Sequence, residues 1–316
     1  MITATRRNMI AAAVMFALLT ACTAASPSPT SSTATTSAAP SSAAPSASSA
    51  PSPVAEIPDG QLIVAGNLFV CIDIPYPPQE AFDDAGNPVG SDVDIAAEIA
   101  KRLGLTMKVE NTVFDVIIPA LTGGKCDIIV SAQNINADRL EQVDMVPYFK
   151  AGQSFVVAKG NPKAIKTEPD LCGKTIAVEK GTTELDYLQG TSDYEGAGLS
   201  DGCVKDGSAA ITIKQFDKDN DALLALQSGT ADAYFADSPA AGYYVVQHPD
   251  QFELSGLTLD VALEGISVAK TNTGLRDAIK TALLSMIDDG AYASILDTWG
   301  LADSAVTADE VNSGKQ

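Results

Sequence analysis

The chain has 316 residues, of which 40 are acidic and 20 are basic, and its formal net charge at pH 7 is −20. This length allows two folded units with cores of their own, and the negative charge excludes nucleic acid and anionic lipid as expected partners. The single histidine, His248, lies in a His-Pro-Asp turn, so we expect neither a histidine metal site nor a histidine base.

Residues 1–21 are typical of an export signal. Two arginines precede a short apolar run, Met9 to Leu19, which is too short to span a bilayer as a mature helix. The sequence Leu19-Thr20-Ala21-Cys22 resembles a bacterial lipobox. This resemblance implies cleavage before Cys22 and acylation of that cysteine, with palmitate among the chains, which would anchor the protein to the outer face of the cell membrane. An ordinary signal peptide followed by a chance cysteine is the alternative.

Residues 22–57 are predicted to form a flexible tether. From Thr23 to Ala55 the chain is almost entirely Ser, Ala, Thr and Pro, without a charged residue. Such a segment has too little bulky apolar surface to fold. Coil statistics give it a reach of roughly 30 Å, so the folded part would stand away from the membrane.

Four further cysteines follow the tether: Cys71, Cys126, Cys172 and Cys203. An even number in an exported chain indicates disulfides, and three pairings are possible. The first two cysteines lie in apolar strands of the first half, and the other two flank a strand and helix of the second half. We therefore favour Cys71–Cys126 and Cys172–Cys203. A metal site is not expected, because there is no CxxC spacing and no neighbouring histidine.

Strands and helices alternate in the first half of the folded part. The patterns predict strands at Asn67–Asp73, Leu105–Glu110 and Cys126–Ser131, and helices at Ser91–Leu103 and Val116–Thr122. Asp92 is expected to cap the first of these helices, and Asp94 to be solvated. This alternation is typical of a mainly parallel α/β sheet.

The same alternation restarts after Pro147-Tyr148-Phe149. We predict strands at Gln153–Ala158, Thr175–Val178, Ile211–Phe216, Asp232–Phe235 and Gly265–Ala269, with helices from Gly181-Thr182-Thr183-Glu184 and at Asn220–Ser228, Leu275–Ile287 and Ala291–Trp299. The expected fold is α/β with two lobes. Lobe 1 comprises 58–150 plus 264–303, lobe 2 comprises 151–263, and 304–316 form a loose tail. The crossings near 149–153 and 258–264 would be hinges.

A short internal sequence similarity relates the two lobes. Ala120–Asp127 matches Ala225–Asp232, and the same offset sets Ala132 against Asp237. Each lobe would then present the carboxyl end of a corresponding strand, where open α/β sheets bind ligands.

The stretch from Val130 to Arg139 runs from a strand end into a helix start. Free N–H groups, a positive helix end and the guanidinium of Arg139 would suit a small carboxylate. Asp237 in the other lobe would suit an ammonium group, so a cleft between the lobes would suit a zwitterion. A solvated surface arginine is the alternative.

Several separated motifs in this order resemble the polar amino-acid substrate-binding proteins of ABC importers. The resemblance covers about residues 66–301. It rests on Tyr76-Pro77-Pro78, Gly90-Ser91-Asp92-Val93-Asp94, Phe114-Asp115, Ile118-Pro119-Ala120-Leu121, Ser131 to Arg139, Asp170-Leu171-Cys172-Gly173-Lys174, Gly181-Thr182-Thr183, Asp232-Ala233, Asp237 and Trp299-Gly300.

The resemblance implies a set of ligand-binding residues. Arg139 would bind the α-carboxylate, helped by the backbone near Ser131, Ala132 and Asn134 and by Thr182 and Thr183 of the second lobe. Asp237 would bind the α-ammonium group, Tyr76 and Phe114 would cover the apolar part, and Asp73 would face the side chain or the ammonium group. Asn134, Asn136, Gln79 and Ser91 depart from the usual pattern, which leaves the choice of amino acid open.

The expected function is that of a monomeric, membrane-tethered receptor, without a cofactor, that binds a free amino acid and hands it to the membrane subunits of an ABC importer. No catalysis is expected. The alternative is an enzyme on the same fold, similar to cyclohexadienyl dehydratase, with Glu179 or Glu184 as acid or base. A sensor module is a third alternative.

Overall fold

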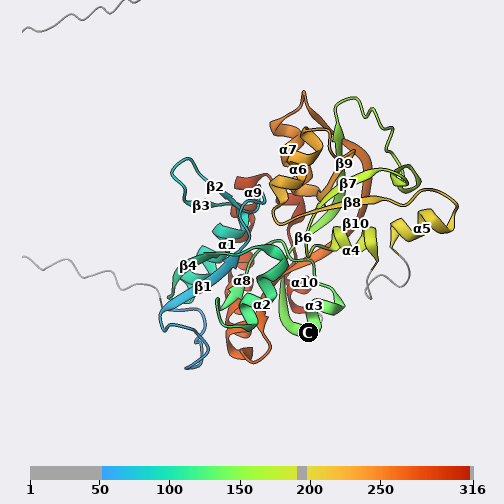
Figure 1. Ribbon diagram of the computed structural model, residues 1–316. Helices are drawn as coiled ribbons and strands as arrows, with labels where there is room; N and C mark the ends of the chain where they lie inside the picture. Colours follow the sequence, from blue (N-terminus) through green and yellow to red (C-terminus); the bar gives the residue numbers. More distant parts are fainter. Residues whose placement is uncertain (1–51, 191–197, 314–316) are drawn as a thin grey trace, which may run out of the picture. The chain divides into compact units, whose positions relative to one another are not determined.

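The computed structural model describes residues 52–190 and 198–313 (Figure 1). The signal peptide, Cys22, most of the tether and the last three residues lie outside these ranges. The strands are β1 (Asn67–Ile72), β2 (Ala81–Phe82), β3 (Pro88–Val89), β4 (Thr106–Asn111), β5 (Ile128–Ile129), β6 (Val143–Ala158), β7 (Thr175–Glu179), β8 (Thr212–Phe216), β9 (Ala233–Asp237) and β10 (Phe252–Ala269).

The helices lie between and after these strands. They are α1 (Ser91–Arg102), α2 (Ile117–Thr122), α3 (Ala137–Gln142), α4 (Thr183–Gln189), α5 (Leu199–Lys205), α6 (Asp219–Gln227), α7 (Ser238–Gln247), α8 (Thr273–Asp288), α9 (Ala291–Trp299) and α10 (Ala308–Ser313), with 3-10 turns at Phe114–Val116, Glu168–Leu171 and Ala302–Ser304. None of the helices in the described part is long and apolar enough to span a bilayer.

Eight strands form one sheet in the order β4-β1-β5-β10-β6-β9-β7-β8. β1 is parallel to β4 and β5, and β7 is parallel to β8 and β9, so each end of the sheet has the expected parallel pairing. The long strands β6 and β10 run antiparallel to each other along the middle and belong to both ends. We call the β4-β1-β5 end with its helices lobe 1, and the β9-β7-β8 end with its helices lobe 2.

β6 begins ten residues earlier than expected, because Pro147 does not interrupt it. Pro147 lies opposite Gly265, where the register of β6 and β10 shifts. A proline lacks the N–H of a regular ladder and is tolerated at such an irregularity. The register of this pair also shifts between Leu254 and Thr258 and between Leu259 and Ala262.

Alternate residues of β1 serve two faces of the lobe 1 sheet. Leu68, Val70 and Ile72 pack with α1, α8 and α9, whereas Cys71 packs with α2. This alternation is what a strand buried on both faces requires. In lobe 2, α6 and α7 cover one face of β7 and β9, and α4 and α5 cover the other.

Each lobe contains one disulfide, and the pairing is the expected one. Cys71 is bonded to Cys126, and Cys172 is bonded to Cys203. The first bridge joins β1 to the loop before β5, and the second joins the start of lobe 2 to α5. Both bonds therefore fix elements within a lobe and leave the two lobes unlinked.

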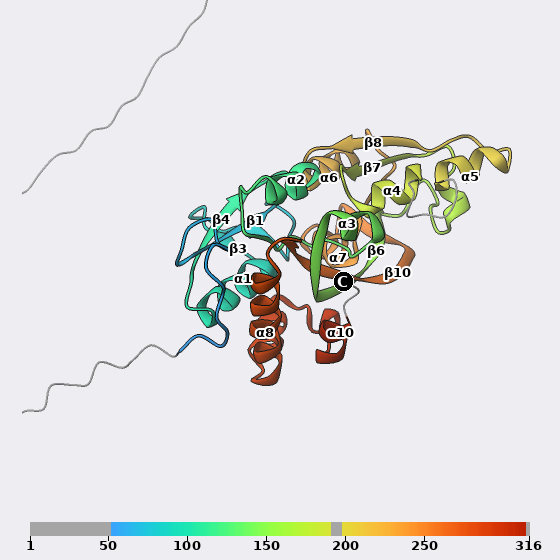
Figure 2. The same ribbon diagram turned by 90° about the horizontal axis from the view of Figure 1, so that it is seen from below.

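The structure corrects both predicted ends of the folded part. The residues after 303 are not a loose tail: α10 lies beside α8 (Figure 2), and Val306 and Val311 are buried in the lobe 1 core. Glu310 also pairs with Lys150 at 3.3 Å. At the other end, Ala55 and Ile57 pack against the same core, so the tether stops short of residue 57. The sequence does not predict these contacts, because each terminal segment has only two buried or partly buried apolar residues, too few to show a helical or strand periodicity.

Candidate ligand-binding site

A cavity lies between the lobes and is lined by residues of both. Lobe 1 contributes Tyr76, Phe114, Ala132, Asn134 and Arg139, and lobe 2 contributes Glu179, Thr182, Thr183, Glu184 and Asp237. Eight of these ten lining residues belong to the ligand-binding set expected from the sequence. Glu179 and Asp237 end β7 and β9, and Arg139 and Thr183 lie in the first turns of α3 and α4. Tyr76, Phe114, Ala132 and Asn134 lie in the segments that follow β1, β4 and β5.

Arg139 lies in the first turn of α3, and its backbone N–H donates to the side chain of the N-cap residue Asn136 at 2.9 Å. The guanidinium is buried, with 7% of the residue exposed. Its Nη1 donates to the carbonyl of Asn134 at 2.8 Å, and its Nη2 donates to the carbonyl of Gly181 in lobe 2 at 3.0 Å. The guanidinium carbon lies 5.3 Å from the centre of the Phe114 ring. These contacts hold the cation inside the cavity rather than in solvent.

Asp237 ends β9 on the opposite side of the cavity and is 4% exposed. The hydroxyl of Tyr76 donates to its Oδ2 at 3.0 Å and accepts from its backbone N–H at 2.9 Å. Its Oδ1 has no hydrogen-bond partner among the described residues. Burial, followed by the charges of Glu184 and Glu264, raises the pKa of Asp237 well above its usual range. A positive group beside this carboxyl would lower its pKa again, because an opposite charge favours the ionised form.

The Gly181-Thr182-Thr183 turn precedes α4. Thr182 is the N-cap, and its hydroxyl donates to the carbonyl of Glu179 at 2.9 Å and accepts from the N–H of Leu185 at 3.2 Å. The hydroxyl of Thr183 accepts from Nε2 of Gln153 at 2.7 Å. The hydroxyl of Thr183 also donates to Oε2 of Glu184 at 3.4 Å. Thr182 therefore shapes the turn, and both threonines line the cavity.

Gly181 of lobe 2 lies close to the backbone of Asp115 in lobe 1. Its φ is +75°, and a Cβ added there would lie 2.8 Å from the Cα of Asp115 in lobe 1. A side chain at this position would push the lobes apart, because Cβ atoms do not approach backbone carbon that closely.

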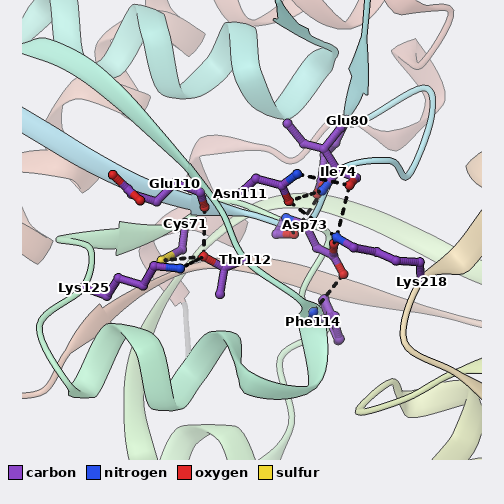
Figure 3. A network of polar contacts seen from close by, with 11 residues as sticks. Cys71, Asp73, Ile74, Glu80, Glu110, Asn111, Thr112, Phe114, Lys125 and Lys218 are labelled. Atoms are coloured by element: carbon purple, nitrogen blue, oxygen red, sulfur yellow. Dashed lines mark hydrogen bonds and ion pairs between the residues drawn. The ribbon is translucent and has the colours of Figure 1, made fainter. Parts of the chain in front are cut away.

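Asp73 and Ser131 were expected at the ligand but do not line the cavity. Oδ2 of Asp73 accepts from the N–H of Phe114 at 2.8 Å, and the hydroxyl of Ser131 accepts from the N–H of Asp73 at 3.0 Å. Lys218 of lobe 2 forms an ion pair with Oδ1 of Asp73 (Figure 3). Asp73 is thus bound to a lysine of the protein itself, and a contact of Asp73 with the ligand stays a prediction.

Asp92 is a buried support residue and not the expected helix cap. The N-cap of α1 is Gly90, and Oδ2 of Asp92 accepts from the N–H of Ala132 at 3.0 Å and from the hydroxyl of Tyr148 at 2.6 Å. Ala132 has a φ of 43°, in the left-handed region, and Asp92 holds it there. Burial raises the pKa of Asp92 to about 6. The N–H of Ala132 is consequently engaged with Asp92 rather than free for a ligand.

Asp219, the first residue of α6, is buried in lobe 2, and its carboxylate accepts hydrogen bonds from the hydroxyls of Tyr234 and Tyr244. Burial raises its pKa from an ordinary 3.8 to about 7. Between these values the folded protein keeps a proton that the unfolded chain loses, so the free energy of unfolding falls as pH rises.

We expect the free energy of unfolding of Asp219→Asn to fall less steeply with pH than that of the wild type, by at most about 1.4 kcal/mol per pH unit. Urea unfolding at pH 5 and pH 7 measures the difference. Asp217→Asn, at an exposed carboxylate paired with Lys180, is the control and should follow the wild type. Equal slopes for wild type and Asp219→Asn would show that Asp219 is ionised throughout.

Comparisons with known proteins show the family of the chain. Residues 68–302 match the bacterial extracellular solute-binding proteins, family 3. The chain is 27% identical over 239 residues to the L-cystine-binding protein TcyJ of Escherichia coli K12, covering 75% of this chain and 84% of that protein. It is 28% identical over 267 residues to the arginine-binding protein ArgT of Corynebacterium glutamicum, covering 83% and 84%.

A solved structure extends the likeness to three dimensions. An ancestral arginine-binding protein bound to arginine is 36% identical, with a TM-score of 0.67, and the match covers 74% of this chain and 98% of that one. The family match extends over most of the described residues and includes every residue that lines the cavity. The chain therefore belongs to the bacterial extracellular solute-binding proteins, family 3.

Proposed function

We propose that the protein is an exported receptor that binds a free amino acid between its lobes and delivers it to the membrane subunits of an ABC importer. The observation that carries this proposal is the burial of Arg139 and Asp237, opposite charges from separate lobes, at one cavity. Relatives named for L-cystine and arginine support an amino acid as the ligand.

In this proposal Arg139 binds the α-carboxylate through its planar fork of donors. The carboxylate takes the place of the Gly181 carbonyl, which accepts from Nη2 in the structure. Asp237 binds the α-ammonium group through the Oδ1 that has no partner within residues 52–190 and 198–313. Tyr76 and Phe114 cover the carbon atoms of the ligand, since both rings line the cavity.

Ligand contacts to both lobes favour the closed arrangement, because the open arrangement offers only one lobe at a time. The hinges are the paired segments of β6 and β10 near 149–153 and 258–264. Register shifts lie in or beside these segments, which weakens regular pairing there. The lobe boundaries at 150 and 264 rest on the same feature.

Gly181→Ala tests closure. The added Cβ meets Asp115 only when the lobes are closed, and overpacking of this kind costs about 1–3 kcal/mol. We expect ligand affinity to fall about 5- to 150-fold in calorimetric titrations. Gly229→Ala is the matched control, because Gly229 has a φ of +70° but no atom within 4 Å of an added Cβ. Equal effects of the two substitutions on affinity would contradict closure over this turn.

The ligand and the absence of catalysis are tested together. Thermal-shift and calorimetric titration against the twenty amino acids should identify at least one ligand that is recovered unchanged. The enzyme alternative uses Glu179 or Glu184 as acid or base and requires turnover of a cyclic carboxylate of the prephenate type. Turnover without amino-acid binding would replace the receptor by this enzyme.

The proposed membrane anchor is a lipid on Cys22, which lies outside the described residues. The apolar run and the Leu19-Thr20-Ala21-Cys22 sequence support it. We expect mass spectrometry of the membrane fraction to find a mature N-terminus at Cys22 with two or three acyl chains. An unmodified N-terminus at another residue would contradict the anchor. A monomeric state belongs to the same proposal.

A further inference from the structure

A lysine of lobe 2 pairs with a carboxylate of lobe 1 outside the cavity. Lys218 is the N-cap residue of α6, and its ammonium group forms an ion pair with Oδ1 of Asp73, which directly follows β1 (Figure 3). The two side chains are 24% and 5% exposed. Because the partners belong to different lobes, this pair forms only when the lobes are as close as in this structure.

Lobe 1 offers a fixed set of acceptors to this ammonium group. Besides pairing with Asp73, the group donates to the carbonyl of Ile74 at 3.1 Å and to Oδ1 of Asn111 at 3.4 Å (Figure 3). Oδ2 of Asp73 accepts from the N–H of Phe114 at 2.8 Å, and Oδ1 of Asn111 accepts from the N–H of Ile74 at 3.3 Å. The three donors of the lysine therefore meet three acceptors that lobe 1 holds in place.

Lys218 reaches these acceptors from the start of α6. Its carbonyl oxygen accepts from the N–H groups of Asp221 at 3.1 Å and Ala222 at 3.4 Å, so its backbone moves with that helix and with lobe 2. Opening of the lobes would therefore carry the ammonium group away from all three acceptors at once.

The pair differs from the contacts between the lobes that lie at the cavity. There Arg139 donates to the carbonyl of Gly181, and in the proposed function a ligand carboxylate takes the place of that carbonyl. Lys218 and Asp73 are not among the residues that line the cavity. Their pair can therefore remain while a ligand is bound.

Building on the proposed function, we propose that Lys218 is an affinity-determining residue that holds the lobes closed over the bound ligand. A ligand enclosed by both lobes leaves only after they open, and opening breaks the Lys218–Asp73 pair whichever ligand is bound. Lys218 therefore slows the release of every ligand by the same factor and does not select among amino acids.

Stopped-flow displacement of bound ligand from the mature protein tests this proposal, with the two amino acids of the twenty that bind most tightly. We expect Lys218→Met to release both about 10-fold faster than the wild type, as for the loss of a hydrogen bond between charged groups. Lys163→Met is the matched control, because Lys163 pairs with Asp232 at 2.8 Å within lobe 2. It should release both ligands at the wild-type rate.

A double-mutant cycle with Asp73→Asn separates the pair from other effects of Lys218. Burial raises the pKa of Glu179 in the cavity wall, and the charge of Lys218 opposes this rise, so an effect through Glu179 is the alternative. If the pair is responsible, Lys218→Met accelerates release in the wild type but not in Asp73→Asn. Equal acceleration in both backgrounds would overturn the inference.

Wild-type release rates in Lys218→Met would overturn the inference and leave the receptor function standing. Factors that differ between the two ligands would do the same, because they would place Lys218 at the ligand rather than between the lobes. If no amino acid binds the wild-type protein, the proposed function fails, and this inference fails with it. Asp73→Asn provides the same test from lobe 1 if Lys218→Met does not fold, since it should also release both ligands faster by one common factor.

Discussion

Arg139→Ala is expected to reduce amino-acid affinity by about 2–5 kcal/mol, which corresponds to about 30- to 5,000-fold. The residue is buried, and the ligand carboxylate would lose its only cationic partner among the described lining residues. The carboxylate would then be desolvated without compensation, which is more costly than losing a solvated ion pair. Calorimetric titration with the tightest ligand measures the change.

Arg276→Ala is a suitable control for this experiment. Arg276 of α8 pairs with Asp144 of β6 and with its neighbour Asp277, and it does not line the cavity. Its removal should lower stability slightly and leave affinity unchanged, because partly exposed ion pairs contribute about 0–1 kcal/mol. If Arg139→Ala binds as tightly as Arg276→Ala, the carboxylate is not bound by Arg139.

Asp237→Asn is expected to have the second large effect on affinity, again about 2–5 kcal/mol. Asparagine keeps the shape and can still accept from the hydroxyl of Tyr76, but it cannot balance an ammonium group. Burial raises the pKa of Asp237, and a ligand ammonium group beside it would lower that pKa again, because an opposite charge favours the ionised carboxylate. Isothermal titration at pH 7 measures the loss.

Asp217→Asn is the matched control, because Asp217 is an exposed carboxylate of lobe 2 paired with Lys180. It should bind the ligand like the wild type. Wild-type affinity in Asp237→Asn, together with a large loss in Glu184→Gln, would move the ammonium site from Asp237 to Glu184. Wild-type affinity in both variants would show that neither Asp237 nor Glu184 binds the ligand ammonium group.

Local patterns predicted the residues whose positions depend on nearby sequence. The prediction of Arg139 follows from a strand end and a helix start within ten residues. Asp237 follows from the offset between two similar strand–helix units, and the disulfides follow from one cysteine pair in each half. Each of these predictions needed only the alternation of strands and helices, and the spacing of apolar residues indicates that alternation.

Contacts between distant segments were not predictable in the same way. Lys218 is 145 residues from Asp73 and lies in the other lobe, so nothing near either residue indicates their pairing. Asp92 has the position of a helix cap in the sequence, but Tyr148 and Ala132 bind it from other elements. The sequence suggests Glu179 and Glu184 only as the acids of an enzyme, because it does not show that both line the cavity with Asp237.

A crystal structure of the mature protein grown with its tightest-binding amino acid tests the central claim most directly. The account predicts the α-carboxylate within about 3 Å of both terminal nitrogens of Arg139 and the α-ammonium group at a similar distance from Asp237. A ligand bound elsewhere, with Nη2 of Arg139 still donating to the carbonyl of Gly181, would contradict it.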